Sequence, residues 1–118
     1  MKSLKRGMII DVNLNPTQGS ETGKVRPCVI VTNDIYNAKV PVIQVIPITA
    51  WNTKKSLIKT NIEIFPSCKN GLLKKSIADC LQTRPIDWKH RFIKLRGILE
   101  TTQMEMINQA LKCVFELR

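Results

Sequence analysis

Apolar and polar positions along the chain predict mostly β-strands. Met8–Leu14 alternates between the two classes, which is typical of a strand with one exposed face. The run after Arg26 is continuously apolar and rich in β-branched residues, which predicts a buried strand over Pro27–Thr32. By the same criteria we expect four more strands, over Val42–Thr49, Thr60–Phe65, Ser76–Thr83 and Phe92–Leu99.

The hydrophobic period changes at the end of the chain. Met104, Ile107, Leu111 and Val114, with Ala110 beside them, fall on one face of a helix, and Thr102-x-x-Glu105 has the form of a capping box. A short helical turn is expected between residues 33 and 39, and a tight turn at Asn70-Gly71. The sequence therefore predicts a small, curled, mostly antiparallel sheet closed by a C-terminal helix, in a single domain over residues 1–118.

Charge adds a constraint on the partner. The chain has 118 residues, 43% of them hydrophobic, and a formal net charge of +10. The segment from Lys54 to Arg96 holds eleven basic residues and only three acidic ones. A single lysine is best explained as part of a solvated surface, but so uneven a segment favours a polyanion such as nucleic acid.

The cysteine pattern argues against a metal site and against a disulfide framework. Cys28, Cys68, Cys80 and Cys113 form no CxxC pair, and His90 is the only histidine. We expect reduced thiols in a cytoplasmic protein with no metal and no cofactor. The basic start of the chain resembles a signal peptide, but Asp11 interrupts the apolar stretch that follows, so neither a secretion signal nor a membrane-spanning helix is expected.

A glycine-containing polar loop, Pro16–Pro27, delivers Arg26 to the start of a buried strand. If this strand pairs antiparallel with Val42–Thr49, residues whose numbers add up to about 75 face each other, and Arg26 lies opposite Thr49. A permanently charged fork and a hydroxyl would then meet at one end of the sheet. Taken singly, Arg26 is better explained by a salt bridge with Glu21, and Thr49 as an ordinary strand threonine.

A series of short motifs runs along nearly the whole chain, in the order Arg6-Gly7, Asp11-x-x-Leu14-x-Pro16-Thr17, Gly19-Ser20-Glu21, Lys24-Val25-Arg26-Pro27, Val31-x-Asn33-Asp34, Pro47-Ile48-Thr49, Ser76, Gln82-x-Arg84 and Ile86-Asp87. Together they resemble the MazF/PemK family of toxin endoribonucleases. The resemblance implies an SH3-like barrel of about five to seven mostly antiparallel strands with a C-terminal helix. It also implies a homodimer, metal-independent cleavage of single-stranded RNA, usually mRNA, and a cognate antitoxin whose acidic C-terminal segment fills the RNA groove.

These residue types suit that chemistry, because RNA carries its own nucleophile, the 2′-hydroxyl. Arg26 matches a phosphate bidentately, and Thr49 can donate a further hydrogen bond to the transition state. The expected products are a 2′,3′-cyclic phosphate and a 5′-hydroxyl. Glu21 is a tentative third catalytic residue, and the residues leave open whether it orients Arg26 or takes a proton.

The resemblance also suggests which residues contact RNA: Ser20, Lys24, Lys54, Lys55, Gln82 and Arg84. For Gln82 a structural role is an equal alternative. Two other functions stay open at this stage. A toxin of the same fold can poison a protein such as DNA gyrase without catalysis, and a basic SH3-like module can bind nucleic acid without cleaving it.

Overall fold

The computed structural model describes residues 3–118, which form seven strands and five short or long helical segments. The strands are β1 (Met8–Asn13), β2 (Val25–Ile30), β3 (Val42–Ala50), β4 (Asn61–Ile64), β5 (Ser76–Asp79), β6 (Arg84–Asp87) and β7 (Phe92–Ile98). The helices are α1 (Asp34–Asn37), α2 (Thr53–Ser56), the 3₁₀ turn η1 (Cys80–Gln82), α3 (Trp88–Arg91) and α4 (Thr101–Phe115).

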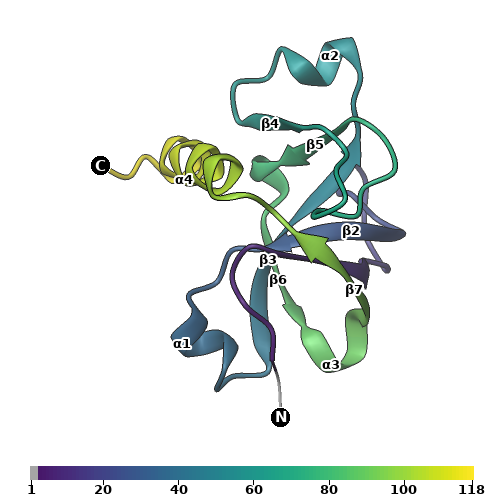
Figure 1. Ribbon diagram of the computed structural model, residues 1–118, viewed down its shortest axis with the longest axis vertical. Coiled ribbons are helices and arrows are strands. Elements are labelled where there is room, and N and C mark those ends of the chain that lie inside the picture. Colours follow the sequence, from purple (N-terminus) through teal and green to yellow (C-terminus); the bar gives the residue numbers. More distant parts are fainter. Residues whose placement is uncertain (1–2) are drawn as a thin grey trace.

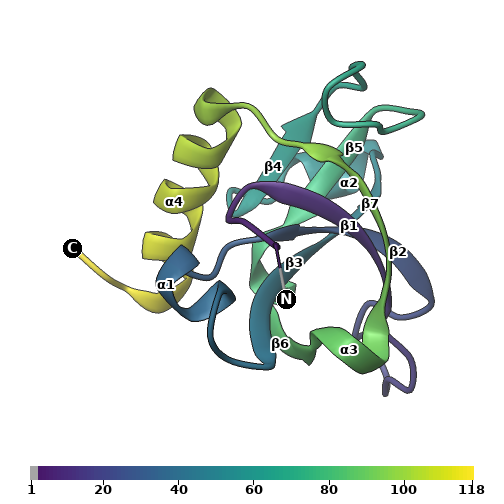
Figure 2. The same ribbon diagram turned by 60° about the horizontal axis from the view of Figure 1, so that its bottom comes forward.

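All strand pairings are antiparallel, and the sheet has the order β4-β5-β3-β2-β1-β7, with β6 also paired to β3. The long strand β3 joins the parts of the sheet, because its first half pairs with β6 and its last three residues pair with β5. Figures 1 and 2 show the sheet curling round on itself, with α4 along the side of β4. The predicted curled sheet with a C-terminal helix is confirmed.

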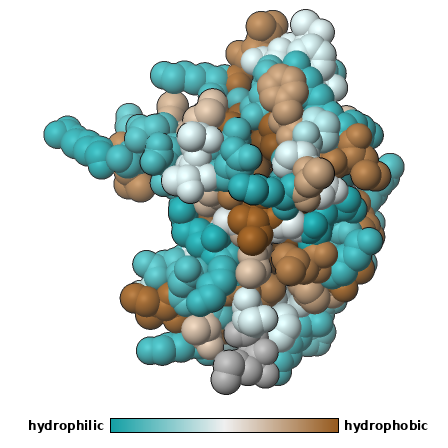
Figure 3. Space-filling model, viewed as in Figure 1, coloured by the Kyte–Doolittle hydropathy of each residue, from teal (hydrophilic) through white to brown (hydrophobic). Residues whose placement is uncertain are grey.

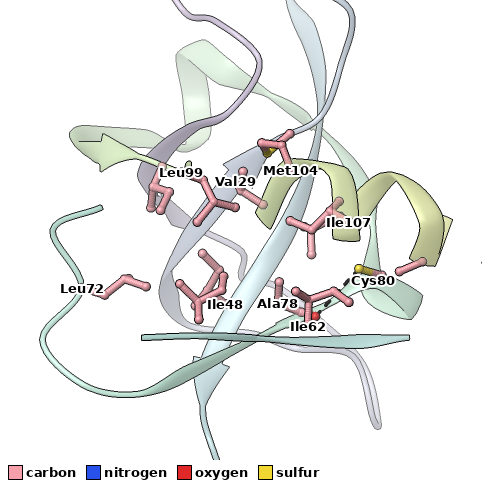
Figure 4. Close-up of a cluster of buried hydrophobic side chains, with 13 residues drawn as sticks. Val29, Ile48, Ile62, Leu72, Ala78, Cys80, Leu99, Met104 and Ile107 are labelled. Carbon is pink, nitrogen blue, oxygen red and sulfur yellow. Dashed lines mark hydrogen bonds between the residues drawn. The ribbon is translucent and has the colours of Figure 1, made fainter. Parts of the chain in front are cut away.

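Two apolar cores lie on opposite faces of the central strands. Ile9 of β1, Val29 of β2 and Ile48 of β3 belong to the core that Met104 and Ile107 of α4 cover (Figure 4). Their neighbours along the same strands face the second core, inside the curl: Ile10, Val12, Cys28, Ile30, Ile43 and Val45. Burial on both faces explains why β2 and β3 are apolar without alternation.

Strand β1 differs from its prediction, since it is not half exposed. Four of its six residues, Ile9–Val12, are buried, including the charged Asp11. The carboxylate of Asp11 can be buried because the guanidinium of Arg96 on β7 pairs with both of its oxygens. The polar position in the pattern therefore marked a buried ion pair and not a solvent-facing side.

Two further predictions were wrong in detail. The expected strand Ser76–Thr83 ends at Asp79, continues as η1, and is followed by the separate strand β6, in which Pro85 is tolerated. The capping box at Thr102 does not form, because the N-cap is Glu100, two residues earlier, with no side-chain cap. The Thr102 hydroxyl donates to the side-chain amide oxygen of Gln103 instead. The extended conformation of Glu100 sets the helix start, so Thr102 already lies in the first turn.

The surface is mixed in character. On the face shown in Figure 3, hydrophilic residues cover most of the area and hydrophobic ones form separate patches. Within residues 3–118, every helix is too short or too polar to cross a lipid bilayer.

Candidate active site

Strands β2 and β3 separate just where Arg26 and Thr49 lie. The observed pairs are Cys28 with Pro47, Val29 with Ile46 and Ile30 with Val45, so the predicted register, with numbers adding up to 75, is confirmed. The ladder stops at Cys28 and Pro47. Arg26 and Thr49 are therefore not a ladder pair, and the prediction that set them directly opposite each other was wrong in that detail. On their other edges, Arg26 pairs with Val12 of β1 and Thr49 pairs with Ile77 of β5.

Two prolines stand where the strands part. Pro27 and Pro47 have no backbone N–H to donate to a ladder, and neither can continue the hydrogen bonding between β2 and β3. The gap between the diverging strands is a pocket of about 210 Å³. Both Arg26 and Thr49 line it, so the structure brings the two predicted catalytic residues to one place.

Arg26 is held by its inner nitrogen only. Its Nε donates to the carbonyl of Gly23 at 3.2 Å, and for its two terminal nitrogens residues 3–118 supply no acceptor. Gly23 is closely surrounded, because a Cβ on it would lie 2.5 Å from Oγ1 of Thr17 and 2.7 Å from Oδ1 of Asn15, and these side chains would have to move. The fork of Arg26 is therefore oriented by the loop and free to bind an anion.

Thr49 is 8% exposed, and its hydroxyl has one partner. Nζ of Lys55 donates to Oγ1 of Thr49 at 3.2 Å, from the short helix α2 that follows β3. A hydroxyl has one hydrogen and two lone pairs, so the hydrogen of Thr49 remains available for a ligand in the pocket.

Two cations at this pocket were not among the predicted site residues. Lys74, an exposed residue of the segment before β5, lines it together with Arg96. Arg96 donates from Nε and Nη2 to the two carboxylate oxygens of Asp11 at 2.7 and 3.0 Å, and from Nη1 to the Gly71 carbonyl at 2.9 Å. These bonds to Asp11 raise the pKa of Arg96 above its usual value. The charge of Arg96 is thus largely balanced by Asp11, and its bond to the Gly71 carbonyl holds the segment that forms one wall of the pocket.

The loop between β1 and β2 is held in place from η1 and β6. Gln82 accepts from the Thr22 amide at 3.2 Å and donates to the Ser20 carbonyl at 3.1 Å. Arg84 donates to the Leu14 carbonyl at 3.1 Å. Gln82 lies on η1 and not on a strand, so the part of the prediction that put it on the fifth strand was wrong. Both side chains have a structural task here.

Glu21 lies outside the pocket of Arg26. It is exposed, accepts from the Gln18 amide at 2.8 Å, and lines a second pocket of about 430 Å³ with Gln82 and Arg84. No ion pair joins Glu21 to Arg26 in the part of the chain that is described, so the salt bridge considered for Arg26 is absent there. The catalytic role of Glu21 stays a prediction.

The remaining candidates are surface residues. Ser20, Lys24 and Lys54 are all exposed. Lys24 adopts a left-handed conformation, with φ +68°, and its amide donates to Oδ1 of Asn15 at 2.9 Å. These positions leave the three side chains open to solvent and to a ligand.

The four cysteines are free thiols. Burial raises the pKa of both Cys28 and Cys80 to about 12, although nearby Arg84 and Arg26 act on Cys28 in the opposite direction. Across residues 3–118, no three His, Cys, Asp or Glu side chains come together as a metal site would require.

The fold is similar to that of proteins whose structures have been solved. The structure of MazF from Deinococcus radiodurans superposes with a TM-score of 0.82 at 18% identity, covering 97% of each chain. An endoribonuclease from Mycobacterial species, solved in complex with its cognate antitoxin, gives a TM-score of 0.74 at 19% identity and covers 100% of this chain and 98% of its own. At these identities the likeness establishes the fold.

Sequence relatives establish the family. The family described as PemK-like, MazF-like toxin of type II toxin-antitoxin system matches residues 5–115. The Endoribonuclease MazF of Staphylococcus saprophyticus is 36% identical over 108 residues, which is 92% of this chain and 88% of the relative. That of Staphylococcus epidermidis is 37% identical over 105 residues, 89% and 86% of the two chains. The chain belongs to the PemK-like, MazF-like toxin family.

Proposed function

We propose that the chain is an endoribonuclease toxin that cleaves single-stranded RNA, mRNA above all, in the cytoplasm and without a metal ion. One observation carries the proposal: Arg26 and Thr49 share a pocket, and each has hydrogens that no acceptor in residues 3–118 takes up. The name endoribonuclease, given to the two staphylococcal relatives, supports it. The net charge of +10 suits a polyanionic substrate.

The proposed reaction is an intramolecular transfer within the RNA. The 2′-oxygen bonds to the adjacent phosphorus as its proton leaves, the bond from phosphorus to the 5′-oxygen breaks, and that oxygen takes up a proton. The products are a 2′,3′-cyclic phosphate and a 5′-hydroxyl. Arg26 binds the non-bridging oxygens bidentately, and the Thr49 hydroxyl donates to one of them as negative charge builds up.

The rest of the predicted site serves to bind the RNA. Lys24, Lys54 and Ser20 are exposed, while Gln82 and Arg84 lie at the second pocket with Glu21. The loop that carries Arg26 borders both pockets. A strand of RNA with its scissile phosphate at Arg26 would therefore place neighbouring nucleotides over this second pocket.

The proposal includes two protein partners. One is a second copy of the chain, in a homodimer, and the other is a cognate antitoxin. An antitoxin with an acidic C-terminal segment would present carboxylates to the same cations that bind phosphate, Arg26 and Lys74 among them. The Mycobacterial neighbour, which was solved with its cognate antitoxin, supports this partner.

Incubation of the purified protein with single-stranded RNA in EDTA tests the reaction. We expect cleavage at a short preferred sequence, with cyclic phosphate ends identified by mass spectrometry. An RNA with a single 2′-deoxy sugar before the cut site is the matched control, and it should remain intact at that site. Cleavage of the deoxy substrate, or a requirement for a divalent metal, would contradict the proposal.

A further inference from the structure

Two adjacent lysines on α2 are alike in sequence and different in structure. Lys54 is exposed, and within the described residues its ammonium has no partner. Lys55 is half-buried and turns toward the pocket, where its Nζ lies 3.2 Å from Oγ1 of Thr49. Nothing in the sequence distinguishes the two lysines, whereas the structure connects only Lys55 to the candidate active site.

The backbone of Lys55 is fixed at both of its polar groups. Its amide donates to Oδ1 of Asn52 at 2.7 Å, which caps α2, and its carbonyl accepts from Nδ2 of the buried Asn61 at 3.0 Å. Asn61 belongs to β4, which pairs with β5 in the sheet. The lysine is therefore carried by the sheet and not by a loose loop, so its ammonium has a defined place.

A carboxylate interacts electrostatically with this ammonium. Asp79 of β5 pairs with Asn61 across the strands. Burial raises the pKa of Asp79, whereas the backbone amides of Gln82 and Leu81 and the positive charge of Lys55 lower it. Lys55 thus acts on a partly buried carboxylate as well as on the hydroxyl of Thr49.

The contact determines what the hydroxyl of Thr49 can do. An ammonium group has only hydrogens to give, so Lys55 must occupy a lone pair of Oγ1. The hydroxyl hydrogen then points elsewhere, and no acceptor among residues 3–118 takes it. Without Lys55 the hydroxyl would be free to rotate and to accept a hydrogen bond where the reaction needs a donor.

We propose that Lys55 is a positioning residue, whose ammonium holds the Thr49 hydroxyl as a hydrogen-bond donor toward the scissile phosphate. The inference rests on the proposed ribonuclease function and deepens it, since it assigns Lys55 a task beyond general attraction of RNA. Lys54 has no such task and contributes only to binding.

Lys55→Met and Lys54→Met form a matched pair, because each removes one charge and keeps a similar side-chain length. For Lys55→Met we expect kcat to fall roughly tenfold to a hundredfold, the range of a hydrogen bond to a charged group, with KM little changed. For Lys54→Met we expect KM to rise a few-fold with kcat unchanged. Lys55→Arg should recover part of kcat, because it keeps a charged donor.

A double variant separates an action through Thr49 from a direct one. In a Thr49→Val background the hydroxyl is absent, so adding Lys55→Met should lower kcat little further. A full additional loss of kcat there, or equal kcat in the two lysine variants, would overturn the inference while leaving RNA cleavage established. A parent protein that does not cleave RNA would overturn both proposals. If circular dichroism shows that Lys55→Met does not fold, Lys55→Arg is compared with Lys55 in the parent and in the Thr49→Val background. A loss of kcat that occurs only in the parent supports the inference, and an equal loss in both backgrounds overturns it.

Discussion

Arg96 and Asp11 form a bidentate ion pair across β7 and β1, at 2.7 and 3.0 Å, beneath the pocket that contains Arg26 and Thr49. The side chain of Asp11 is 7% exposed, and Lys94 reaches one of its oxygens only at 3.9 Å. The third donor group of Arg96 holds the Gly71 carbonyl, so the pair connects the barrel to the segment that walls the pocket.

Removal of Arg96 should therefore destabilise the protein strongly. Arg96→Met leaves the carboxylate of Asp11 buried with only the distant Lys94, and we expect the free energy of unfolding to fall by about 3 kcal/mol. Urea denaturation followed by tryptophan fluorescence measures this change. Lys94→Met is the control and should lower the free energy of unfolding by less than about 1 kcal/mol, because Lys94 is largely exposed. Equal losses in the two variants would contradict the assigned role of the ion pair.

Arg26→Ala should abolish RNA cleavage without affecting the fold. The only hydrogen bond from the Arg26 side chain within residues 3–118 goes to Gly23, so the substitution should lower the free energy of unfolding only slightly. By comparison with other arginines that stabilise phosphoryl transfer, we expect kcat/KM to fall by about a thousandfold. Single-turnover cleavage of a fluorogenic RNA measures the loss, and expression of the variant should no longer inhibit growth. Arg26→Lys should remain impaired, because an ammonium cannot bind a phosphate bidentately.

Gly23→Ala tests how the loop orients Arg26. The added Cβ would lie 2.5 Å from Oγ1 of Thr17 and 2.7 Å from Oδ1 of Asn15, closer than any relaxed contact, so these side chains must move. Because Oδ1 of Asn15 accepts from the Lys24 amide, we expect the movement to disturb the loop beside Gly23. Because the Gly23 carbonyl holds Nε of Arg26, we expect at least a tenfold loss of kcat with a small change in melting temperature. Gln18→Ala is the control and should keep full activity, because the exposed Gln18 of the same loop lines neither pocket. A Gly23→Ala variant with full activity would show that this bond is dispensable.

Glu21→Gln distinguishes the two roles left open for Glu21. The loss of a general base typically costs between about a hundredfold and ten-thousandfold in rate. Since Glu21 lies outside the pocket of Arg26 and bonds to Gln18, we expect less than a tenfold loss. The pH–rate profile of the variant is the accompanying measurement. A larger loss, together with disappearance of the acidic limb of that profile, would identify Glu21 as the group that takes the 2′-proton.

The cysteines provide a test of burial. With pKa values raised to about 12, Cys28 and Cys80 remain protonated thiols at pH 8, and both are buried. Iodoacetamide reacts with thiolates, so in the native protein it should modify only Cys68 and Cys113. Mass spectrometry of tryptic peptides reads the pattern, and denatured protein should be modified at all four. Rapid modification of Cys28 in native protein would show that the second core opens.

The sequence allowed the fold and the central register to be predicted, because local patterns determine them. The apolar run of β2 and the turn before β3 were enough to set Val29 opposite Ile46. The ladder ends before Arg26 and Thr49, which meet across a pocket and not as a strand pair. Strand β6 was missed because Pro85 argues against a strand when its partner is unknown.

The rest of the site depends on contacts between distant segments. Arg96 lies on β7, 85 positions from its partner Asp11, and nothing local marks it as part of the pocket. Lys54 and Lys55 could not be distinguished either, since their difference lies in burial and in the contact of Lys55 with Thr49, which the folded chain alone defines. Such information exists only once the chain has folded.

The parting of β2 and β3 at Pro27 and Pro47 has a consequence for control of the protein. The pocket is walled by core strands, so its shape is set once the barrel has folded. On the proposed function, a molecule that occupies the pocket, such as the proposed antitoxin, would block Arg26 and Thr49 directly, and its abundance relative to this chain would set how much of the protein can bind RNA.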